Sequence, residues 1–257
     1  MNKENQHTMP VNGKLTVVGA GPGDVELITL KAIRALKTAD VVLYDALVNE
    51  ELLKYCENAE LLFVGKRKGC YAFKQSEIND LIVKYGKTHG HVIRLKGGDP
   101  FIFGRGAEEM DYAINNGMEV AMVPGLSSCA SVPALQNIPV TKRGSSESFW
   151  VITATTKDHK LSNDVFDAAK SNATVVILMG MHKLSQIVSA FVNEGKSQTP
   201  IAIIQNGTRQ AEKVGIGTIE TILNVVEKQH LSSPAIIVIG DVVNHKVSIE
   251  KLKNEMS

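Results

Sequence analysis

One stretch organises the first half of this chain: Arg94-Leu-Lys-Gly-Gly-Asp-Pro-Phe-Ile-Phe-Gly-Arg-Gly106. It continues an apolar run from His91, breaks at Gly97-Gly98 and restarts at Arg105 with helical spacing. A strand that ends in a glycine-rich turn and feeds a helix is the usual ligand position in an open α/β sheet. The glycines let a ligand approach the backbone closely, because no Cβ stands in the way. Asp99 can accept hydrogen bonds from a hydroxylated ligand and Arg105 can meet an anion; the alternative is a tight turn with an exposed arginine.

Strand-length apolar runs and helical patterns alternate on both sides of this stretch. Strands are predicted at residues 14–20, 40–45, 60–65 and 119–123. Helices are predicted at residues 25–39, 47–55, 76–89 and 106–114. This alternation predicts an α/β fold with a mostly parallel sheet and right-handed crossovers. The strand ends at Gly19, Asp45, Gly65 and Gly97 should then lie along one edge, where such sheets bind ligands.

The second half predicts another α/β domain, whose sheet is mixed. Strands are predicted at residues 149–153, 173–179, 200–205, 213–217 and 235–239, and helices at residues 164–170, 183–193 and 219–229. The run Lys213-Val-Gly-Ile-Gly217 has no crossover helix, which favours antiparallel pairing. The predicted division is a disordered tail over residues 1–12, an N-terminal α/β domain over 13–124, a linker over 125–148, a C-terminal α/β domain over 149–245 and a C-terminal tail over 246–257.

Composition excludes several classes of protein. The 257 residues are 44% hydrophobic and 21% charged with a formal net charge of +1, which favours neither nucleic acid nor a membrane surface as a partner. The three cysteines, Cys56, Cys70 and Cys129, have no CxxC spacing and an odd count. They predict neither a zinc site nor a disulfide framework, but reduced thiols in a cytoplasmic protein. No apolar run approaches the length of a membrane span.

The loop Gly19-Ala-Gly-Pro-Gly-Asp24 follows a predicted strand and opens a helix, as a dinucleotide-binding loop does. It lacks the third glycine of GxGxxG, and Asp24 would repel a pyrophosphate at the start of the helix. A neutral or cationic ligand is therefore favoured over a nicotinamide or flavin nucleotide.

Basic residues gather near the predicted strand ends, although the total charge is close to zero. They are Lys66, Arg67, Lys68, Arg94, Lys96, Arg105, Lys142 and Arg143. This grouping indicates a polyanionic small ligand, carboxylates in particular, and the alternative is an ordinary solvated surface. The histidines show no metal-ligand spacing, and Ser127-Ser128 does not lie in a GxSxG elbow.

Several stretches together resemble the uroporphyrinogen-III C-methyltransferase family, from about Lys14 to Val243. They are Gly19–Asp24, Tyr44-Asp45, Val64-Gly-Lys-Arg67, Arg94–Gly106, Val123-Pro-Gly125, Ile138-Pro-Val-Thr-Lys-Arg143 and Leu178-Met-Gly180. The resemblance implies a two-domain α/β enzyme, usually a homodimer, with S-adenosylmethionine in the cleft between the domains. It implies methylation of uroporphyrinogen III at C2 and C7, giving precorrin-2 by way of precorrin-1, for sirohaem or cobalamin synthesis.

The resemblance also assigns roles to residues. The implied cofactor contacts are Pro22, Gly97, Gly98, Asp99, Ile102, Ser127, Ser128, Met179, Gly207, Pro234 and Ala235. Asp45 corresponds to the family's proposed proton acceptor and Lys66 to its proposed donor. Arg105 corresponds to an arginine implicated in substrate binding, with Glu108 and Arg143 in the same motifs.

Chemistry from the residues agrees with this assignment. A sulfonium methyl is already activated, so the reaction needs alignment more than it needs a metal. Asp45, at a strand end, is a candidate general base, the alternative being a turn residue. Arg105 suits a carboxylate clamp better than a base, since guanidinium stays protonated. Two other classes remain open: a methylase of a later precorrin intermediate, and a non-catalytic tetrapyrrole- or nucleotide-binding protein.

Overall fold

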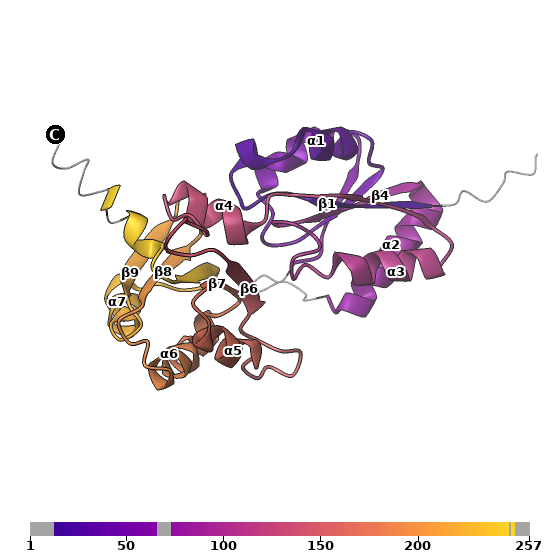
Figure 1. Ribbon diagram of the computed structural model, residues 1–257. Helices are drawn as coiled ribbons and strands as arrows, with labels where there is room; N and C mark the ends of the chain where they lie inside the picture. The colour runs from indigo at the N-terminus through magenta and orange to yellow at the C-terminus, as the bar shows by residue number, and fades with distance from the viewer. Residues whose placement is uncertain (1–12, 66–72, 247, 250–257) are drawn as a thin grey trace, which may run out of the picture. The chain divides into compact units, whose positions relative to one another are not determined.

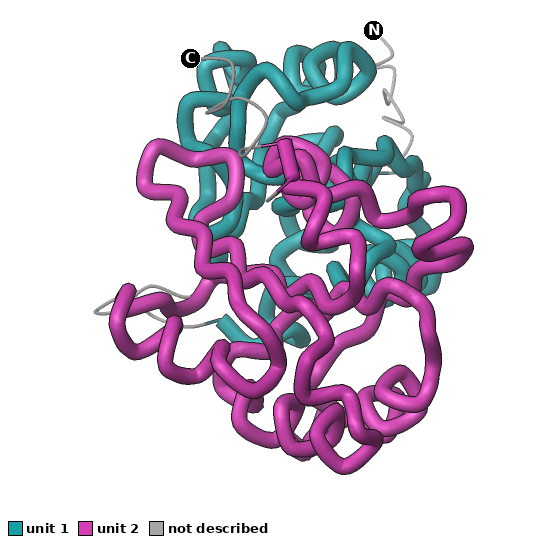
Figure 2. Tube along the Cα trace, turned by 60° about the vertical axis from the view of Figure 1, so that its left-hand side comes forward, with its two compact units in different colours: residues 1–127 teal, residues 128–257 magenta. Residues whose placement is uncertain are grey.

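A computed structural model describes residues 13–65, 73–246 and 248–249. The chain divides into two compact units, residues 1–127 and 128–257, drawn in different colours in Figure 2. Residues 128–148, in the segment predicted as a linker, cluster with the second unit. The tail predicted over residues 1–12 and most of that predicted over 246–257 lie outside the described residues.

Among its described residues, the sheet of unit 1 has five strands, all parallel, in the order β3-β2-β4-β1-β5. The strands are β1 (Lys14–Gly19), β2 (Val41–Tyr44), β3 (Glu60–Phe63), β4 (His91–Lys96) and β5 (Glu119–Val123). The three central strands are almost wholly buried, as continuous apolar runs require when both faces of a sheet are covered. The predicted parallel sheet is confirmed.

Helices cover both faces of this sheet, with α1 on one side and α2 and α3 on the other (Figure 1). The helices are η1 (Val25–Leu27), α1 (Leu30–Leu36), η2 (Glu50–Tyr55), α2 (Gln75–His89) and α3 (Gly106–Asn115). Successive strand residues point to opposite faces of the sheet and pack in different hydrophobic cores. Val18 lies in the core with Leu36, and Val17 lies in the core with Ile82.

The single helix predicted over residues 25–39 is wrong, because the structure has two shorter helices there. Asp24 Oδ1 accepts a hydrogen bond from Glu26 N at 2.9 Å and caps η1. Thr29 Oγ1 accepts one from Ala32 N at 3.1 Å and caps α1. A second N-cap inside the periodic stretch therefore ends one helix and starts the next.

The sheet of unit 2 is mixed, as predicted, and its described strands have the order β6-β7-β10-β8-β9. The strands are β6 (Phe149–Thr153), β7 (Thr174–Leu178), β8 (Pro200–Gln205), β9 (Lys213–Thr218) and β10 (Ala235–Ile239). β6 and β7 are parallel, whereas β10 is antiparallel to both β7 and β8, and β9 is antiparallel to β8.

The helices of unit 2 also cover both faces of its sheet. They include α4 (Ser128–Leu135), α5 (Asp164–Lys170), η3 (Met181–Lys183), α6 (Leu184–Asn193) and α7 (Ile222–Gln229). Phe191 of α6 is buried in one core and Val132 of α4 in the core on the other face. Among the helices of the described residues, none is long and apolar enough to cross a membrane.

Candidate active site

The loops that follow the strands of unit 1 lie along one edge of its sheet. Gly19 pairs with Lys96, and Tyr44 pairs with both Leu95 and Phe63, so the carboxyl ends of these strands are level. The prediction that these strand ends share an edge is confirmed. The loops after β1, β2 and β4 can therefore act on one ligand.

The loops after β1, β4 and β5 meet backbone to backbone, and Leu47 of the loop after β2 packs against Gly97. Gly98 N donates to Gly21 O at 2.7 Å, and Gly21 N donates to Gly98 O at 3.3 Å. A Cβ added at Gly19 would lie 2.5 Å from Gly125 Cα and 2.7 Å from Gly98 O. A Cβ added at Gly97 would lie 2.6 Å from Leu47 Cβ, in the loop after β2. Glycine is thus required where these loops approach one another, and we call this contact of Gly19, Gly21, Gly97, Gly98 and Gly125 the glycine junction.

Asp99 ties two loops of the junction together. Its Oδ1 accepts from Phe101 N at 2.8 Å, and its Oδ2 accepts from Gly125 N at 3.1 Å. Each carboxylate oxygen has a second lone pair. Asp99 is thus a loop-positioning residue whose carboxylate still has acceptor capacity for a ligand.

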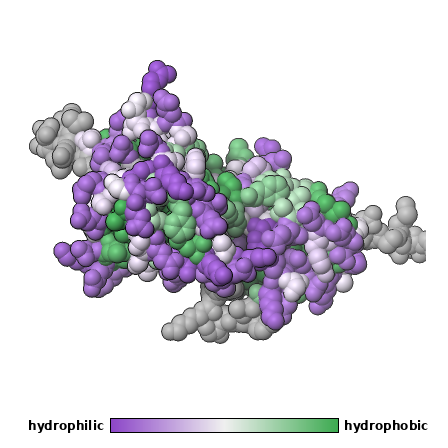
Figure 3. Space-filling view, turned by 60° about the horizontal axis from the view of Figure 1, so that its bottom comes forward, coloured by the Kyte–Doolittle hydropathy of each residue, from purple (hydrophilic) through white to green (hydrophobic). Residues whose placement is uncertain are grey.

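Apolar side chains follow Asp99 and remain exposed. Phe101, Ile102 and Phe103 are 54%, 39% and 44% exposed. On the face drawn in Figure 3, hydrophilic residues predominate and hydrophobic residues form separate patches. A run of three large exposed apolar residues beside a glycine-rich loop is a feature of ligand sites rather than of an ordinary surface.

Arg105 and Glu108 form an exposed ion pair at the start of α3. Arg105 Nη2 donates to Glu108 Oε2 at 2.6 Å, and Arg105 Nε donates to both carboxylate oxygens at 3.1 Å. The two side chains are 52% and 56% exposed. Hydrogen bonding between them raises the pKa of Arg105 and lowers the pKa of Glu108. An exposed charged pair thus lies where the loop after β4 enters α3.

Asp45 follows β2 at the same edge. Its Oδ1 accepts from Leu47 N at 3.1 Å, which makes it a turn residue, and its Oδ2 lies 3.5 Å from Arg94 Nη2. The side chain is 24% exposed. Asp45 can be both a turn residue and a general base, since the turn uses Oδ1 and leaves Oδ2 to accept a proton.

The prediction that Arg94 and Lys96 contribute to an anion-binding surface is wrong. Both lie in β4 and are only 3% and 5% exposed. Their charges are compensated inside the protein by Glu109, a fully buried carboxylate of α3. Arg94 Nε lies 3.1 Å and Lys96 Nζ 3.0 Å from Glu109 Oε1. Burial, followed by the charge of Arg94, lowers the pKa of Lys96, while Glu109 opposes this shift.

Glu109 was not among the residues predicted from the sequence, although the helical spacing of its neighbours indicates a buried position. Gly106, Glu109 and Ala113 follow helical spacing and are all buried, so Glu109 lies on the inward face of α3. A carboxylate on the buried face of a helix needs a cationic partner, and Arg94 and Lys96 supply two.

Basic residues elsewhere are placed differently. Lys66, Arg67 and Lys68 lie outside the described residues. Lys142 and Arg143 are exposed in unit 2, next to a turn in which Lys142 N donates to Ser146 O at 2.9 Å. Among the described basic residues of the prediction, Arg105, Lys142 and Arg143 are thus the exposed ones.

The cofactor residues predicted in unit 2 gather at one edge of its sheet, apart from Ser128, which opens α4. Met179 follows β7 at the edge where the antiparallel β10 begins, and it is 55% exposed with a φ of 55°. Ala235 pairs with Gln205, the last residue of β8, and Asn206 N donates to Pro234 O at 3.0 Å. A Cβ added at Gly207 would collide with Val132 of α4, so the backbone at Gly207 lies directly against the Val132 side chain.

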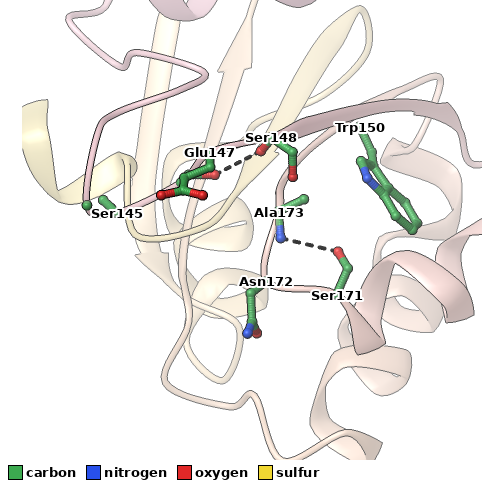
Figure 4. A pocket seen from close by; sticks show the side chains of 9 residues that line it. Ser145, Glu147, Ser148, Trp150, Ser171, Asn172 and Ala173 are labelled. Carbon is green, nitrogen blue, oxygen red and sulfur yellow. Dashed lines mark hydrogen bonds between the residues drawn. The ribbon is translucent and has the colours of Figure 1, made fainter.

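A shallow cavity of about 410 Å³ lies at the opposite edge of the same sheet, where β6 and β7 begin (Figure 4). Its walls include Ser145, Glu147, Ser148, Trp150, Ser171 and Asn172. It contains none of the predicted site residues. Within the described part of the chain, no group of three or more His, Cys, Asp or Glu residues is placed to hold a metal ion.

The chain belongs to the tetrapyrrole (corrin/porphyrin) methylase family, whose model matches residues 14–223. Its relatives include the uroporphyrinogen-III C-methyltransferase of Methanocaldococcus jannaschii, 45% identical over 238 residues, which are 91% of this chain and 98% of the relative. That of Priestia megaterium is 42% identical over 235 residues, 90% and 99% of the two chains. The crystal structure of uroporphyrin-III C-methyl transferase from Thermus thermophilus complexed with S-adenyl homocysteine has a TM-score of 0.78 at 34% identity, covering 90% of this chain and 99% of that one. The family resemblance seen in the sequence is confirmed.

Proposed function

We propose that this protein transfers methyl groups from S-adenosylmethionine to C2 and C7 of uroporphyrinogen III, giving precorrin-2 by way of precorrin-1. The observation that carries the proposal is the glycine junction at the carboxyl edge of the unit 1 sheet, with Asp45 and Arg105 in loops of the same edge. The family membership and the names of the relatives supply the reaction. The product would lead to sirohaem or cobalamin.

The junction suits S-adenosylmethionine better than a nucleotide with a pyrophosphate. Arg94 and Lys96 are turned into the core toward Glu109, and Asp24 caps η1 with its carboxylate. No positive charge of β4 is thus available to a phosphate, whereas backbone carbonyls and the carboxylate of Asp99 suit a ligand with hydroxyls and a cationic sulfur.

The proposed cofactor contacts are the residues that the family resemblance implies. They are Pro22, Gly97, Gly98, Asp99, Ile102, Ser127, Ser128, Met179, Gly207, Pro234 and Ala235. When bound, the cofactor supplies an activated methyl group. The chain would hold it through backbone groups near the glycine junction and through apolar side chains such as Ile102 and Met179, both of which are exposed in the structure.

Residues of the chain itself would orient the substrate and move its proton. Arg105 and Arg143 would pair with substrate carboxylates, and Glu108 would keep the Arg105 guanidinium oriented. Asp45 Oδ2 would accept the proton that leaves the macrocycle after methylation, as a general base. Lys66, outside the described residues, is the proposed proton donor. By family resemblance, we also propose that the protein is a homodimer in the cytoplasm.

The test uses anaerobically prepared uroporphyrinogen III and methyl-labelled S-adenosylmethionine. We expect label transfer and, by mass spectrometry, a product that has gained two methyl groups and lost two protons. No transfer to uroporphyrinogen III would contradict the proposal, and turnover only on a methylated precorrin would assign the chain to a later step. Binding of S-adenosylhomocysteine without turnover on either substrate would indicate a binding protein, and tighter binding of a nicotinamide nucleotide would overturn the cofactor assignment.

A further inference from the structure

A buried charge cluster connects β4, α3 and the loop after β2. We propose that Arg94 is a positioning residue that holds the Asp45 carboxylate in place for proton removal, and that Glu109 holds Arg94. This inference rests on the proposed function, in which Asp45 accepts the proton. Arg94 would contact neither substrate nor cofactor and would act only through Asp45.

The guanidinium of Arg94 is held on three sides. Its Nε donates to Glu109 Oε1 at 3.1 Å, and its Nη1 donates to the carbonyls of Leu43 at 3.3 Å and Leu95 at 3.0 Å. The side chain is 4% exposed. Its remaining nitrogen, Nη2, faces Asp45 Oδ2 at 3.5 Å. Because the guanidinium is planar and rigid, these contacts determine where Nη2 lies.

Asp45 has little else to hold it. Its Oδ1 accepts one backbone hydrogen bond, from Leu47 N, and the side chain is partly exposed. A separation of 3.5 Å exceeds the 2.7–2.9 Å of a charged N–H···O bond, so Arg94 acts on Oδ2 mainly through its charge. The lone pairs of Oδ2 therefore remain available to a proton, while the carboxylate stays oriented toward the cation.

The negative charge of Asp45 also balances the charges of the buried cluster. Glu109 Oε1 is approached by Arg94, by Lys96 and by Gln75 Nε2 at 3.0 Å, whereas Glu109 Oε2 is buried without a hydrogen-bond partner among the described residues. Two cations thus face one fully buried carboxylate. Asp45 supplies the second negative charge, and Arg94 is the cation of the cluster that contacts it.

A double-mutant cycle separates positioning from a structural role. Arg94→Lys keeps a positive charge beside Glu109 but is too compact to reach Glu109 and Asp45 together. We expect kcat to fall about tenfold or more, with the KM for uroporphyrinogen III and the affinity for S-adenosylhomocysteine changed less than about twofold. In the Asp45→Asn background, Arg94→Lys should cause no further loss of kcat.

Lys96→Met is the matched control, because Lys96 is buried like Arg94 and pairs with the same Glu109 Oε1, whereas only its charge, and no ion pair or hydrogen bond, reaches Asp45. Its effect on kcat should therefore depend on Asp45 much less than the effect of Arg94→Lys does. Additive effects of Arg94→Lys and Asp45→Asn, or equal losses of kcat and cofactor affinity, would overturn the inference.

A second variant covers the case in which Arg94→Lys does not fold, as judged by thermal melting. Glu109→Gln has nearly the same volume and removes the charge that holds Arg94 Nε. It should also lower kcat only when Asp45 is present, and additivity would again overturn the inference. A wild-type protein that is inactive on uroporphyrinogen III would instead refute the proposed function.

Discussion

Arg105 Nη2 lies 2.6 Å from Glu108 Oε2, so the arginine proposed to bind substrate carboxylates already has a carboxylate partner. The pair is about half exposed on each side. Exposed ion pairs of this kind contribute only about 0–1 kcal/mol. Breaking the pair therefore costs little free energy, and a substrate carboxylate can replace Glu108. Until then, Glu108 keeps the guanidinium oriented at the start of α3.

Replacing Arg105 with alanine should weaken substrate use far more than cofactor binding. Loss of hydrogen bonds to a charged group, at about 1.5–3 kcal/mol, should lower kcat/KM for uroporphyrinogen III roughly 10- to 150-fold. The affinity for S-adenosylhomocysteine, measured by calorimetry, should not change. Arg34→Ala, an exposed arginine in the last turn of α1, is the control and should leave both values intact. Equal losses of substrate and cofactor binding would contradict the clamp role of Arg105.

The Glu108 carboxyl should titrate at lower pH in the folded protein than in the unfolded chain. Hydrogen bonding to Arg105 lowers its pKa below the ordinary value of 4.5. The pair therefore contributes stability above that value, and the contribution disappears as pH falls through the folded-state pKa. NMR titration of the Glu108 side chain measures this pKa, which should rise in Arg105→Ala. An unchanged pKa in that variant would show that the pair does not persist in solution.

Replacing Asp45 with asparagine should slow the reaction without loosening the cofactor. Asparagine retains the side-chain oxygen that accepts from Leu47 N, so the turn after β2 should survive. Loss of a general base typically lowers turnover by about 10²–10⁴. Single-turnover methyl transfer and S-adenosylhomocysteine binding are the two measurements. Undiminished turnover would remove Asp45 from the mechanism.

The glycine junction should not tolerate a side chain at Gly19. A methyl group there would lie 2.5 Å from Gly125 Cα and 2.7 Å from Gly98 O, and both are backbone atoms that cannot rotate away. Gly117→Ala is the control: it meets no atom within 4 Å but has a φ of +80°, so it should cost only about 1–2 kcal/mol. Chemical unfolding should show a larger loss for Gly19→Ala, with weaker S-adenosylhomocysteine binding. Equal stability losses would mean that the loops are not in contact.

The Cys56 thiol should be nearly inert toward alkylation in the folded protein. Cys56 is 6% exposed, and burial raises its pKa from 9.0 to about 11. Because the thiolate is the nucleophile, its fraction near pH 8 falls about 100-fold for a shift of this size. Peptide mass spectrometry after iodoacetamide treatment, with and without denaturant, gives the two rates. Equal rates in the two conditions would contradict the buried position of Cys56.

Patterns of neighbouring residues predicted most of the elements, because hydrophobic period and caps are local properties. The strand over Pro200–Gln205 and the helix ending at His89 were both predicted from the sequence. The prediction was wrong over residues 25–39, where the cap at Thr29 divides one periodic stretch into two helices. The prediction for Arg94 and Lys96 was wrong for a different reason, since net charge and spacing do not say whether a charged side chain near a strand end is buried against an opposite charge.

The sequence by itself determined the family, the two α/β sheets and the loops in which Asp45, Gly97 and Arg105 lie, because these depend on short runs of residues. Only the tertiary structure decided that Arg94 and Lys96 face the buried Glu109, and that Gly19 lies against Gly125. Those contacts join different strands, helices and loops. They exist because a buried charge needs an opposite charge and because parallel strands bring distant loops to one edge, and both conditions arise only once the sheet is assembled.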